Sequence, residues 1–159
     1  MNKAIFLDRD GVINQEQGYT YRLEDFVILP DLIEVLQLLQ QKGYLLMVVS
    51  NQSGIAKNLY KQSDVEVLHA YLVEELKKNN ITLSEIYYCV HHPDVTNCIC
   101  RKPDSLFIEK GLARFDIDPS RSYFIGDKER DTEAAAKAGV KGILIEANIS
   151  LKTILNQIE

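Results

Sequence analysis

Two carboxylates, Asp8 and Asp10, stand one residue apart directly after an apolar run at the start of the chain. The run, Ala4 to Leu7, is typical of a buried strand in a parallel sheet, where both faces are covered. Extended geometry points alternate side chains the same way, so both carboxylates are placed to face one small volume. Two carboxylates this close repel each other unless a proton or a cation lies between them. The plain alternative is a strand followed by an Asp-Gly turn whose acids are solvated.

Polar residues also follow three other apolar segments, where we expect strands to end. Ser50 and Asn51 follow one segment, Asp127 follows another, and Lys102 lies in the loop after a third. Ligands of open α/β sheets bind outside the carboxyl ends of the strands, so these residues are expected to share one rim with the first two carboxylates. Three carboxylates and an ammonium group suit Mg²⁺ together with a substrate phosphate. They also suit phosphoryl transfer, with one carboxylate as nucleophile and another as acid and base.

All three cysteines, Cys89, Cys98 and Cys100, lie in one short stretch of the chain. An odd number of cysteines in a reducing compartment does not indicate a disulfide framework. Together with His91 they supply three thiolates and one imidazole, the ligand set of a closed structural zinc site. His92 competes for the imidazole position, and the common CxxC spacing is absent, so one buried cysteine and two incidental ones remain the alternative. We expect Zn²⁺ to pin a loop at about 89–102.

The composition is that of an ordinary globular domain, with 159 residues, 46% hydrophobic and 26% charged side chains. This length fits a single domain over 1–159. A net charge of -5 with no basic stripe argues against a nucleic-acid partner, and no apolar run approaches membrane-spanning length. The first apolar run begins too early to leave room for a signal peptide, so a cytoplasmic location is expected. Monomer is the default expectation for the oligomeric state.

Apolar runs and segments of helical periodicity alternate along the chain, which predicts a parallel sheet with right-handed crossovers. The expected strands cover 4–7, 44–49, 86–90, 122–125 and 142–145, and the expected helices cover 31–42, 63–79, 105–114, 131–138 and a short tail from 150. Asp31 is the expected N-cap of the first helix, and Ser63 with Glu66 has capping-box spacing. The polar segment 14–26 is expected to form a flap beside the first strand.

The polar clusters also resemble, in the same order, the motifs of the haloacid dehalogenase (HAD) superfamily of phosphatases. Asp8-Arg9-Asp10-Gly11-Val12 resembles its DxDG(T/V) motif, and Ser50, Lys102 and the run Gly126 to Asp131 resemble the second, third and fourth motifs. The similarity extends over nearly the whole chain. It implies an α/β three-layer Rossmannoid sandwich with a mostly parallel sheet. The connections between the motifs are too short for a large cap domain.

The resemblance implies a role for each matching position of the motifs. These roles are Asp8 as nucleophile, Asp10 as general acid and base, Ser50 as donor to a phosphoryl oxygen, Lys102 as the cation that steadies nucleophile and phosphate, and Asp127 as Mg²⁺ ligand beside Asp8 and the Asp10 carbonyl. Asp131 matches the second acid of the last motif. Its position at a helix start makes a capping role an equal alternative.

The CxH and CxCRKP patterns between Cys89 and Pro103 resemble one branch of this superfamily. That branch has two activities, D-glycero-D-manno-heptose 1,7-bisphosphate phosphatase and histidinol-phosphate phosphatase. The stretches 8–14, 50–56 and 126–128 favour the heptose type, which implies removal of the C7 phosphate of a small phosphorylated sugar. The residues implied to contact substrate are Gly18, Tyr19, Asn51, Gln52, Ser53, Arg101 and Lys128. Arg101 suits this role on its own chemistry, because a guanidinium grips a phosphate bidentately.

Three departures from the branch pattern bear on the substrate rather than on the reaction class. The metal loop is short, nearer the histidinol-phosphatase length; Asp104-Ser105-Leu106 replaces the common Pro-Gly-Met, and Lys57 replaces an Arg. Histidinol phosphate or another small sugar phosphate is therefore the alternative substrate. A different class of protein, a phosphate-responsive receiver-like module, also clusters acids and a lysine around Mg²⁺. Such a module needs neither the second aspartate of the first motif nor a zinc loop.

Overall fold

The computed structural model describes residues 1–159 and contains one five-stranded, all-parallel sheet in the order β3-β2-β1-β4-β5. The strands are β1 (Lys3–Leu7), β2 (Tyr44–Asn51), β3 (Leu83–Cys89), β4 (Tyr123–Gly126) and β5 (Lys141–Leu144). The α-helices are α1 (Leu32–Gln41), α2 (Gln62–Lys78), α3 (Leu106–Arg114) and α4 (Glu129–Lys137), and 3₁₀ turns cover η1 (Leu23–Asp25), η2 (Pro119–Arg121) and η3 (Leu151–Gln157). The α/β three-layer architecture and the parallel sheet expected from the sequence are confirmed.

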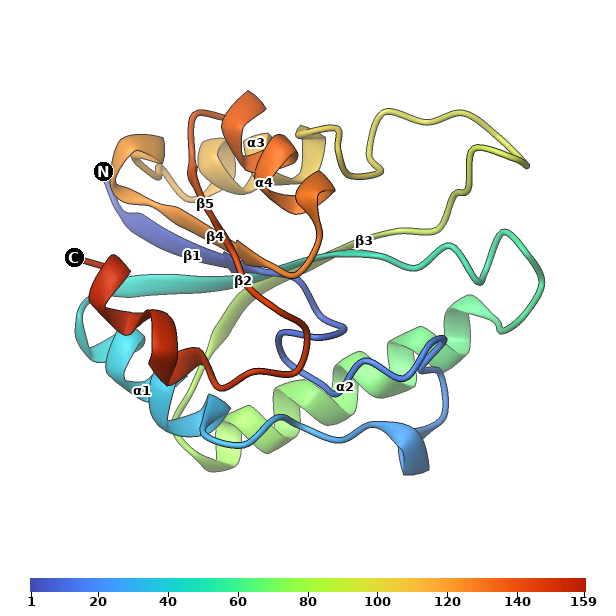
Figure 1. The fold of residues 1–159 in the computed structure, drawn as a ribbon, viewed down its shortest axis with the longest axis horizontal. Helices are drawn as coiled ribbons and strands as arrows, with labels where there is room; N and C mark the ends of the chain where they lie inside the picture. Colours follow the sequence, from blue (N-terminus) through green and yellow to red (C-terminus); the bar gives the residue numbers. More distant parts are fainter.

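Helices cover both faces of the sheet, as Figure 1 shows, with α1 and α2 on one side and α3 and α4 on the other. The larger apolar core lies under α1, α2 and η3 and includes Leu36, Leu72 and Ile154. The smaller core lies under α3 and α4 and includes Phe6 and Ile108. Because helices cover both faces of the sheet, the central strands β1, β2 and β4 are nearly continuous buried apolar runs and are readable in the sequence, whereas the edge strands β3 and β5 are only partly buried.

The first strand lies at the centre of the sheet, between β2 and β4. Leu7 pairs with Val48 on one side and with Ile125 on the other, and the Asp8 amide still donates to the Ile125 carbonyl over 3.0 Å. The chain builds β2 and β3 outward on one side of β1 and then β4 and β5 on the other. The strand order therefore reverses between β1 and β4, the point where open α/β sheets bind their ligands.

Helix starts differ from expectation in three places. Asp31 occupies the N-cap position of α1 but makes no capping bond, and its backbone is left-handed at φ 64°. The capping box of Ser63 and Glu66 is wrong: α2 begins one residue earlier, and the Lys61 amide donates to Asp64 Oδ2 over 2.8 Å. Helix α4 likewise begins two residues earlier than expected, which places Asp131 at its third position. The tail forms the expected short helix, which is of the 3₁₀ type.

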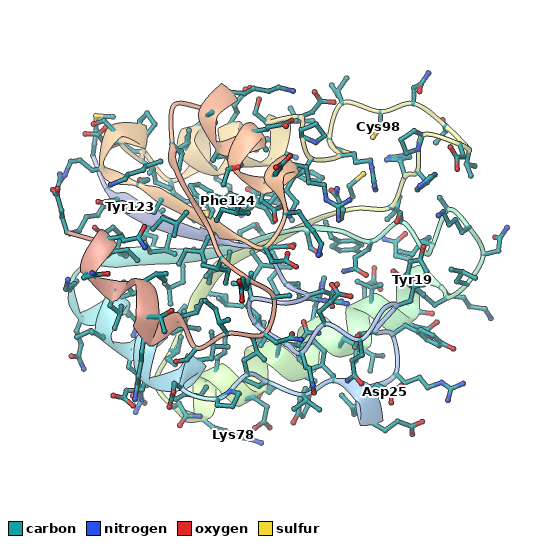
Figure 2. All side chains as sticks on the ribbon, viewed as in Figure 1. Tyr19, Asp25, Lys78, Cys98, Tyr123 and Phe124 are labelled. Atoms are coloured by element: carbon teal, nitrogen blue, oxygen red, sulfur yellow. The ribbon has the colours of Figure 1, made fainter.

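Three irregular segments gather where the strands end, at the right of Figure 1. They are residues 14–26 after β1, 52–61 after β2 and 90–104 after β3. Figure 2 places Tyr19 and Cys98, from the first and third segments, at this end of the molecule, and Tyr123 at the other. No separate cap is inserted between β1 and α1 or between β3 and α3, as expected. None of the helices combines the length and apolarity needed to cross a membrane.

Candidate active site

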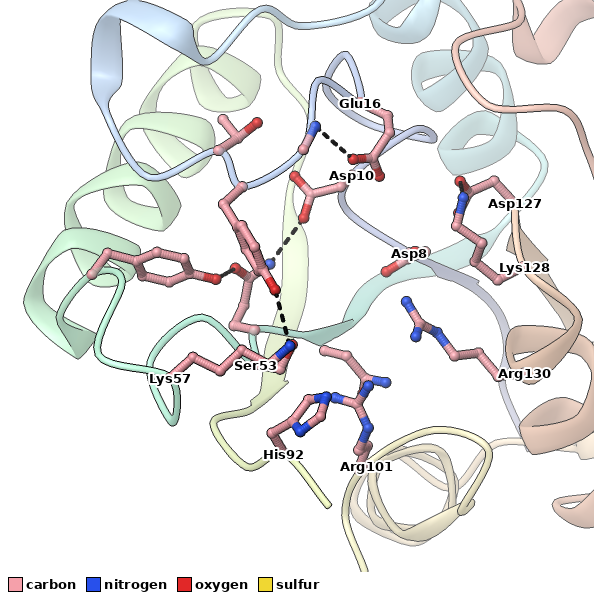
Figure 3. A pocket seen from close by; sticks show the side chains of 16 residues that line it. Asp8, Asp10, Glu16, Ser53, Lys57, His92, Arg101, Asp127, Lys128 and Arg130 are labelled. Carbon is pink, nitrogen blue, oxygen red and sulfur yellow. Dashed lines mark hydrogen bonds and ion pairs between the residues drawn. The ribbon is translucent and has the colours of Figure 1, made fainter. Parts of the chain in front are cut away.

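A polar pocket of about 460 Å³ opens at the carboxyl end of the sheet (Figure 3). Its sixteen lining residues are Asp8, Asp10, Glu16, Gly18, Tyr19, Thr20, Asn51, Gln52, Ser53, Lys57, Tyr60, His92, Arg101, Asp127, Lys128 and Arg130. Only two of them are hydrophobic, so the pocket suits a polar, charged ligand. It joins residues that directly follow β1 and β4, the last residue of β2 and residues of all three irregular segments, as expected if they share one rim.

Lys102 is buried beneath Asp8 at the floor of this pocket. Its Nζ lies 2.9 Å from Asp8 Oδ1, 2.7 Å from Asp131 Oδ1 and 2.7 Å from the Val49 carbonyl. Burial alone would lower the pKa of Lys102, but the two ion pairs outweigh it and raise the pKa. The lysine therefore remains a cation and leaves the second Asp8 oxygen open to the pocket. This arrangement, with one oxygen held and the other facing the pocket, suits a carboxylate that serves as a nucleophile.

Asp131 both belongs to the charged cluster of the site and caps helix α4, the two roles that the sequence left open. Its side chain is fully buried, with Oδ1 paired to Lys102 and Oδ2 accepting a 3.0 Å hydrogen bond from the Lys128 amide. The first interaction neutralises a buried charge, and the second caps α4. Burial raises the pKa of Asp131, and Lys102 opposes that rise. One carboxylate therefore ties the start of α4 to the pocket floor.

Asp10 is surrounded by hydrogen-bond donors. Arg9 Nη2 lies 3.0 Å from Oδ1 and 3.2 Å from Oδ2, and Arg9 Nε also donates to Oδ1 over 3.3 Å. Asn14 Nδ2 donates to Oδ1 over 2.9 Å, and Gln52 Nε2 donates to Oδ2 over 3.0 Å. Tyr60 fixes the orientation of the Gln52 amide by donating to Oε1 over 2.8 Å. The Asp10 carboxyl is therefore held in one orientation from several sides.

Ser50 lies just below the pocket rather than among its lining residues, and it is buried. Its Oγ accepts a 2.9 Å hydrogen bond from Gln52 Nε2, which leaves the hydroxyl proton free to be donated to a ligand. Asn51 behaves differently from expectation. Its Oδ1 accepts from the Lys102 amide over 3.0 Å, and its Nδ2 donates to the Lys102 carbonyl over 3.1 Å. Both ends of this amide are therefore engaged in holding Lys102 in place.

A group of carboxylates fits a hard divalent cation. Oxygen atoms of Asp8, Asp127 and Asp131 lie within 4.8 Å of one another. The Asp127 side chain is 1% exposed; its Oδ2 pairs with Lys128 Nζ over 2.9 Å, and its buried Oδ1 has no hydrogen-bond partner. Burial raises the pKa of Asp127, and the neighbouring charge of Asp8 adds to the rise. Buried carboxylate oxygens without hydrogen-bond partners are the donors that Mg²⁺ prefers.

The four expected zinc ligands also gather at one point. Cys89 Sγ lies 3.7 Å from Cys98 Sγ and 3.2 Å from Cys100 Sγ, and His91 Nδ1 lies 3.5 and 3.4 Å from Cys89 and Cys100. A tetrahedral Zn²⁺ with usual bond lengths spaces its sulfurs by about 3.8 Å and its nitrogen from sulfur by about 3.5 Å. Three of the four distances fit a tetrahedral ion, and the distance between the Cys89 and Cys100 sulfurs is about 0.6 Å shorter than such an ion requires. His92 is not in this group and lines the active-site pocket instead.

The remaining expected contacts, Gly18, Tyr19, Gln52, Ser53, Arg101 and Lys128, all line the pocket. The sequence reasoning missed Glu16, Lys57, His92, Arg130 and the aromatic pair Tyr21 and Tyr60, which stack with centroids 5.2 Å apart. Arg130 was detectable, because it lies inside the Gly126–Asp131 motif. Its Nε is buried without a partner, and Figure 3 shows its guanidinium, like that of Arg101, extending toward Asp8.

Comparison with known proteins gives consistent results. The HAD-hydrolase-like family profile matches residues 99–159. The D-glycero-alpha-D-manno-heptose-1,7-bisphosphate 7-phosphatase of Campylobacter jejuni is 41% identical over 92% of this chain and 83% of its own length. The D-glycero-beta-D-manno-heptose-1,7-bisphosphate 7-phosphatase of Helicobacter pylori J99 is 42% identical over 96% of this chain and 87% of its own.

Solved structures agree with the sequence relatives. The D,D-heptose 1,7-bisphosphate phosphatase of B. bronchiseptica, crystallised with magnesium and phosphate, superimposes with a TM-score of 0.85 at 30% identity. The match covers 97% of this chain and 86% of that one. The phosphatase of the same name from Burkholderia thailandensis gives a TM-score of 0.67 at 26% identity, over 98% and 85% of the two chains.

Proposed function

The chain belongs to the heptose 1,7-bisphosphate phosphatase family of HAD-like hydrolases, and on that premise we propose that it removes the C7 phosphate of D-glycero-D-manno-heptose 1,7-bisphosphate. The observation that carries the proposal is the floor of the pocket. There Asp8 is fixed by Lys102, with Asp10 beside it and the guanidinium groups of Arg101 and Arg130 facing it. A sugar that carries two phosphates matches a pocket that is polar and rich in cations.

The reaction proceeds in two steps at Asp8. In the first, the free Asp8 oxygen bonds to phosphorus as the bond from phosphorus to the C7 oxygen breaks, and Asp10 gives that oxygen its proton. In the second, Asp10, now a carboxylate, takes a proton from water while the water oxygen bonds to phosphorus and the Asp8–phosphorus bond breaks. Asp8 and a protonated Asp10 are regenerated, and inorganic phosphate leaves.

Lys102 and Ser50 stabilise charge during both steps. Lys102 remains protonated and offsets the negative charge of Asp8 and of the phosphoryl group. The unused Ser50 proton is available to a phosphoryl oxygen. Such donors are fixed before the reaction begins, so no reorganisation is needed as charge moves onto the oxygens.

Mg²⁺ is the catalytic cofactor in this proposal, held by Asp8, Asp127 and the backbone carbonyl of Asp10. When bound it neutralises phosphoryl charge and relieves the repulsion among the carboxylates. The support from this chain is the Asp127 carboxylate, whose buried Oδ1 has no hydrogen-bond partner. The relative crystallised with magnesium and phosphate supports the choice of metal.

Zn²⁺ is the structural cofactor, held by Cys89, His91, Cys98 and Cys100. The support is the tetrahedral spacing of the four ligand atoms. Arg101 and Lys102 follow Cys100 directly, so the ion would hold both cationic side chains at the pocket. Three thiols that form no disulfide also support the expected cytoplasmic location.

The substrate contacts in this proposal divide between the two ends of the sugar phosphate. Ser50, Lys102 and Lys128 serve the phosphate that is transferred, and Arg101 serves the second phosphate. Gly18 and Tyr19 approach from the flap, and Gln52 and Ser53 approach from the loop after β2. The enzyme acts on this small sugar phosphate as a single chain of residues 1–159, with no nucleic acid or membrane required.

Phosphate release from a substrate panel tests the proposal. The panel contains both anomers of the heptose bisphosphate and histidinol phosphate, each with and without Mg²⁺. We expect Mg²⁺-dependent turnover of at least one heptose anomer at a kcat/KM far above that for histidinol phosphate. Preference for histidinol phosphate would overturn the sugar assignment. A single phosphorylation per chain without turnover would overturn the enzyme assignment in favour of a receiver-like module.

A further inference from the structure

Arg9, the residue between the two motif aspartates, is completely buried and does not line the pocket. Its guanidinium donates through Nε and Nη2 to the Asp10 carboxylate, and Nη2 also donates to the Thr20 carbonyl of the flap over 2.8 Å. The guanidinium lies 5.8 Å from the ring centre of Phe26. The Arg9 guanidinium therefore cannot contact a ligand in the pocket, but it holds the Asp10 carboxyl, which can.

The remaining face of the guanidinium is closed by a histidine from α2. Arg9 Nη1 lies 3.4 Å from His69 Nε2, and His69 is 7% exposed. A guanidinium has only donors, so Nε2 must be the acceptor and the ring proton must sit on Nδ1. The imidazole is therefore neutral. Burial, followed by the charge of Arg9, lowers the pKa of His69 to about 3, in agreement with this assignment.

The His69 ring is itself held in place from the far side. It packs edge-on against the Tyr88 ring, with centroids 5.1 Å apart. The Tyr88 hydroxyl donates to Glu66 over 3.2 Å and accepts from Gln62 over 3.0 Å, both on α2. The orientation of the guanidinium is thus fixed by a helix and a strand that belong to the scaffold rather than to the pocket.

We propose that Arg9 and His69 are positioning residues that aim the Asp10 carboxyl at the leaving oxygen of the substrate. The inference rests on the proposed two-step reaction but not on the identity of the sugar. His69 acts only as a neutral acceptor that orients the Arg9 guanidinium, and Arg9 in turn orients the Asp10 carboxyl. Of these three residues, only Asp10 touches the reacting atoms. Without His69 the guanidinium loses one of its anchors, and the Asp10 carboxyl is free to rotate away from the leaving group.

This role predicts a dependence on the leaving group that a purely structural role does not. A sugar alkoxide is a strong base and leaves only when it is protonated, whereas p-nitrophenolate leaves without help. General acid catalysis contributes about 10²–10⁴-fold where it is needed. Misalignment of Asp10 therefore slows the hydrolysis of alkyl phosphates and leaves the first step with p-nitrophenyl phosphate nearly unchanged.

The experiment measures kcat/KM, which reports the first chemical step, for an alkyl phosphate and for p-nitrophenyl phosphate. His69→Leu removes the acceptor, and His69→Gln keeps an acceptor oxygen in its place. For His69→Leu we expect about a tenfold loss with the alkyl substrate and less than about a twofold loss with the aryl one. His69→Gln is expected to recover most of the alkyl activity.

A parallel loss with both substrates, or no loss with either, would overturn the inference. Arg9→Lys keeps the positive charge but removes the planar guanidinium that bonds Asp10 and His69 at once. This variant must show the same selective loss with the alkyl substrate. It therefore provides the test if His69→Leu fails to fold. The alkyl substrate is whichever primary phosphate the wild-type enzyme turns over, heptose bisphosphate or histidinol phosphate. If the sugar assignment is wrong, the wild-type enzyme will not prefer heptose bisphosphate. If the positioning role is wrong, the wild-type result is unaffected and only the variants will fail to show the selective loss.

Discussion

At the scale of single residues, the site is a set of charges that neutralise one another except where a substrate must bind. Lys102 is shared between Asp8 and Asp131, Arg9 is taken by Asp10, and Lys128 pairs with Asp127. Arg130 has no partner of either kind, although one of its nitrogens is buried. This unpaired guanidinium is therefore the strongest candidate for a further contact to the proposed substrate.

Replacing Arg130 tests that assignment. For Arg130→Gln we expect KM for the bisphosphate to rise about tenfold or more, since a charge-assisted hydrogen bond contributes about 1.5–3 kcal/mol. KM for p-nitrophenyl phosphate, which has no second phosphate, is expected to change much less. Arg114→Gln, an exposed arginine on α3 that pairs with Glu85, is the matched control. Equal rises for both substrates would instead assign Arg130 to the transferred phosphate.

His69 also predicts how the stability of the protein depends on pH. Its pKa is about 3 in the folded protein and near 6.5 in the unfolded chain, so the unfolded chain binds more protons between these values. Stability is therefore lost as pH falls through this window, by about 2 kcal/mol between pH 7 and pH 5. In urea unfolding, the free energy of unfolding of His69→Gln should fall between pH 7 and pH 5 by about 2 kcal/mol less than that of wild type. Identical losses in the two proteins would contradict a neutral buried histidine.

Not every residue role follows from the sequence. Asp8, Asp10 and Asp127 were predictable because each closely follows an apolar run, where strand geometry brings them together. Lys102 lies in the loop after β3 and was predictable from its place in the motif order. The hydrogen bonds of Asn51 were not, because no pattern tells whether an amide faces a ligand or a neighbouring backbone. Arg9 was missed for a related reason. Strand alternation predicts that the Arg9 side chain leaves the backbone on the side opposite to the two aspartates. Its burial and its contact with Asp10 depend on the flap and on α2, which the sequence pattern does not place.

At the scale of elements, the strands were predicted well and the helix starts poorly. Strand positions depend on apolar runs buried on both faces, a signal repeated at every residue. A helix start depends on one or two side chains, and around Lys61 several polar residues are spaced so that more than one cap is possible. The loop after β3 has no regular structure at all between Cys89 and Leu106. Its conformation depends on side-chain contacts, namely those among Cys89, His91, Cys98 and Cys100, which are the proposed zinc ligands, and the two hydrogen bonds between Asn51 and the Lys102 backbone.

Removing one zinc ligand tests that view of the loop. In Cys98→Ser we expect the zinc content, measured by atomic absorption, to fall well below one ion per chain, and kcat/KM to fall with it. The catalytic groups all remain, so the loss arises because Arg101 and Lys102 are no longer held in place. Thr96→Ala, an exposed change in the same loop, is the control. Full activity in a zinc-free Cys98→Ser protein would show that the loop does not depend on the metal.

At the scale of the whole molecule, the two cores support a sheet whose carboxyl end crowds carboxylates together, with Lys102 and Lys128 balancing only part of their charge. Asp8, Asp127 and Asp131 lie together, and burial raises the pKa of the last two, so keeping them ionised at neutral pH costs stability. That cost is recovered only when a cation binds, which couples folding to catalysis. The closely spaced Asp8 and Asp10 already indicated repulsion between carboxylates. The size of that repulsion depends on how deeply the carboxylates are buried, which only the fold determines.

The coupling predicts opposite effects of one substitution with and without magnesium. In zinc-loaded protein dialysed free of Mg²⁺, Asp127→Asn should raise Tm by about 2–4 °C, which corresponds to about 1 kcal/mol in a chain of this size. Added Mg²⁺ should raise the Tm of wild type but not of the variant. Asp116→Asn, an exposed carboxylate far from the pocket, should leave both values unchanged. A lower metal-free Tm for Asp127→Asn would contradict the proposed repulsion.

The most direct test of the whole account is to trap the phosphorylated enzyme. Wild-type protein is mixed with labelled substrate and Mg²⁺, quenched in acid within the first turnover, digested, and analysed by mass spectrometry. The account predicts one phosphoryl group per chain on Asp8, formed and lost at rates compatible with turnover, and neither label nor activity in Asp8→Asn. Turnover without a phosphorylated peptide, or retained activity in Asp8→Asn, would contradict it.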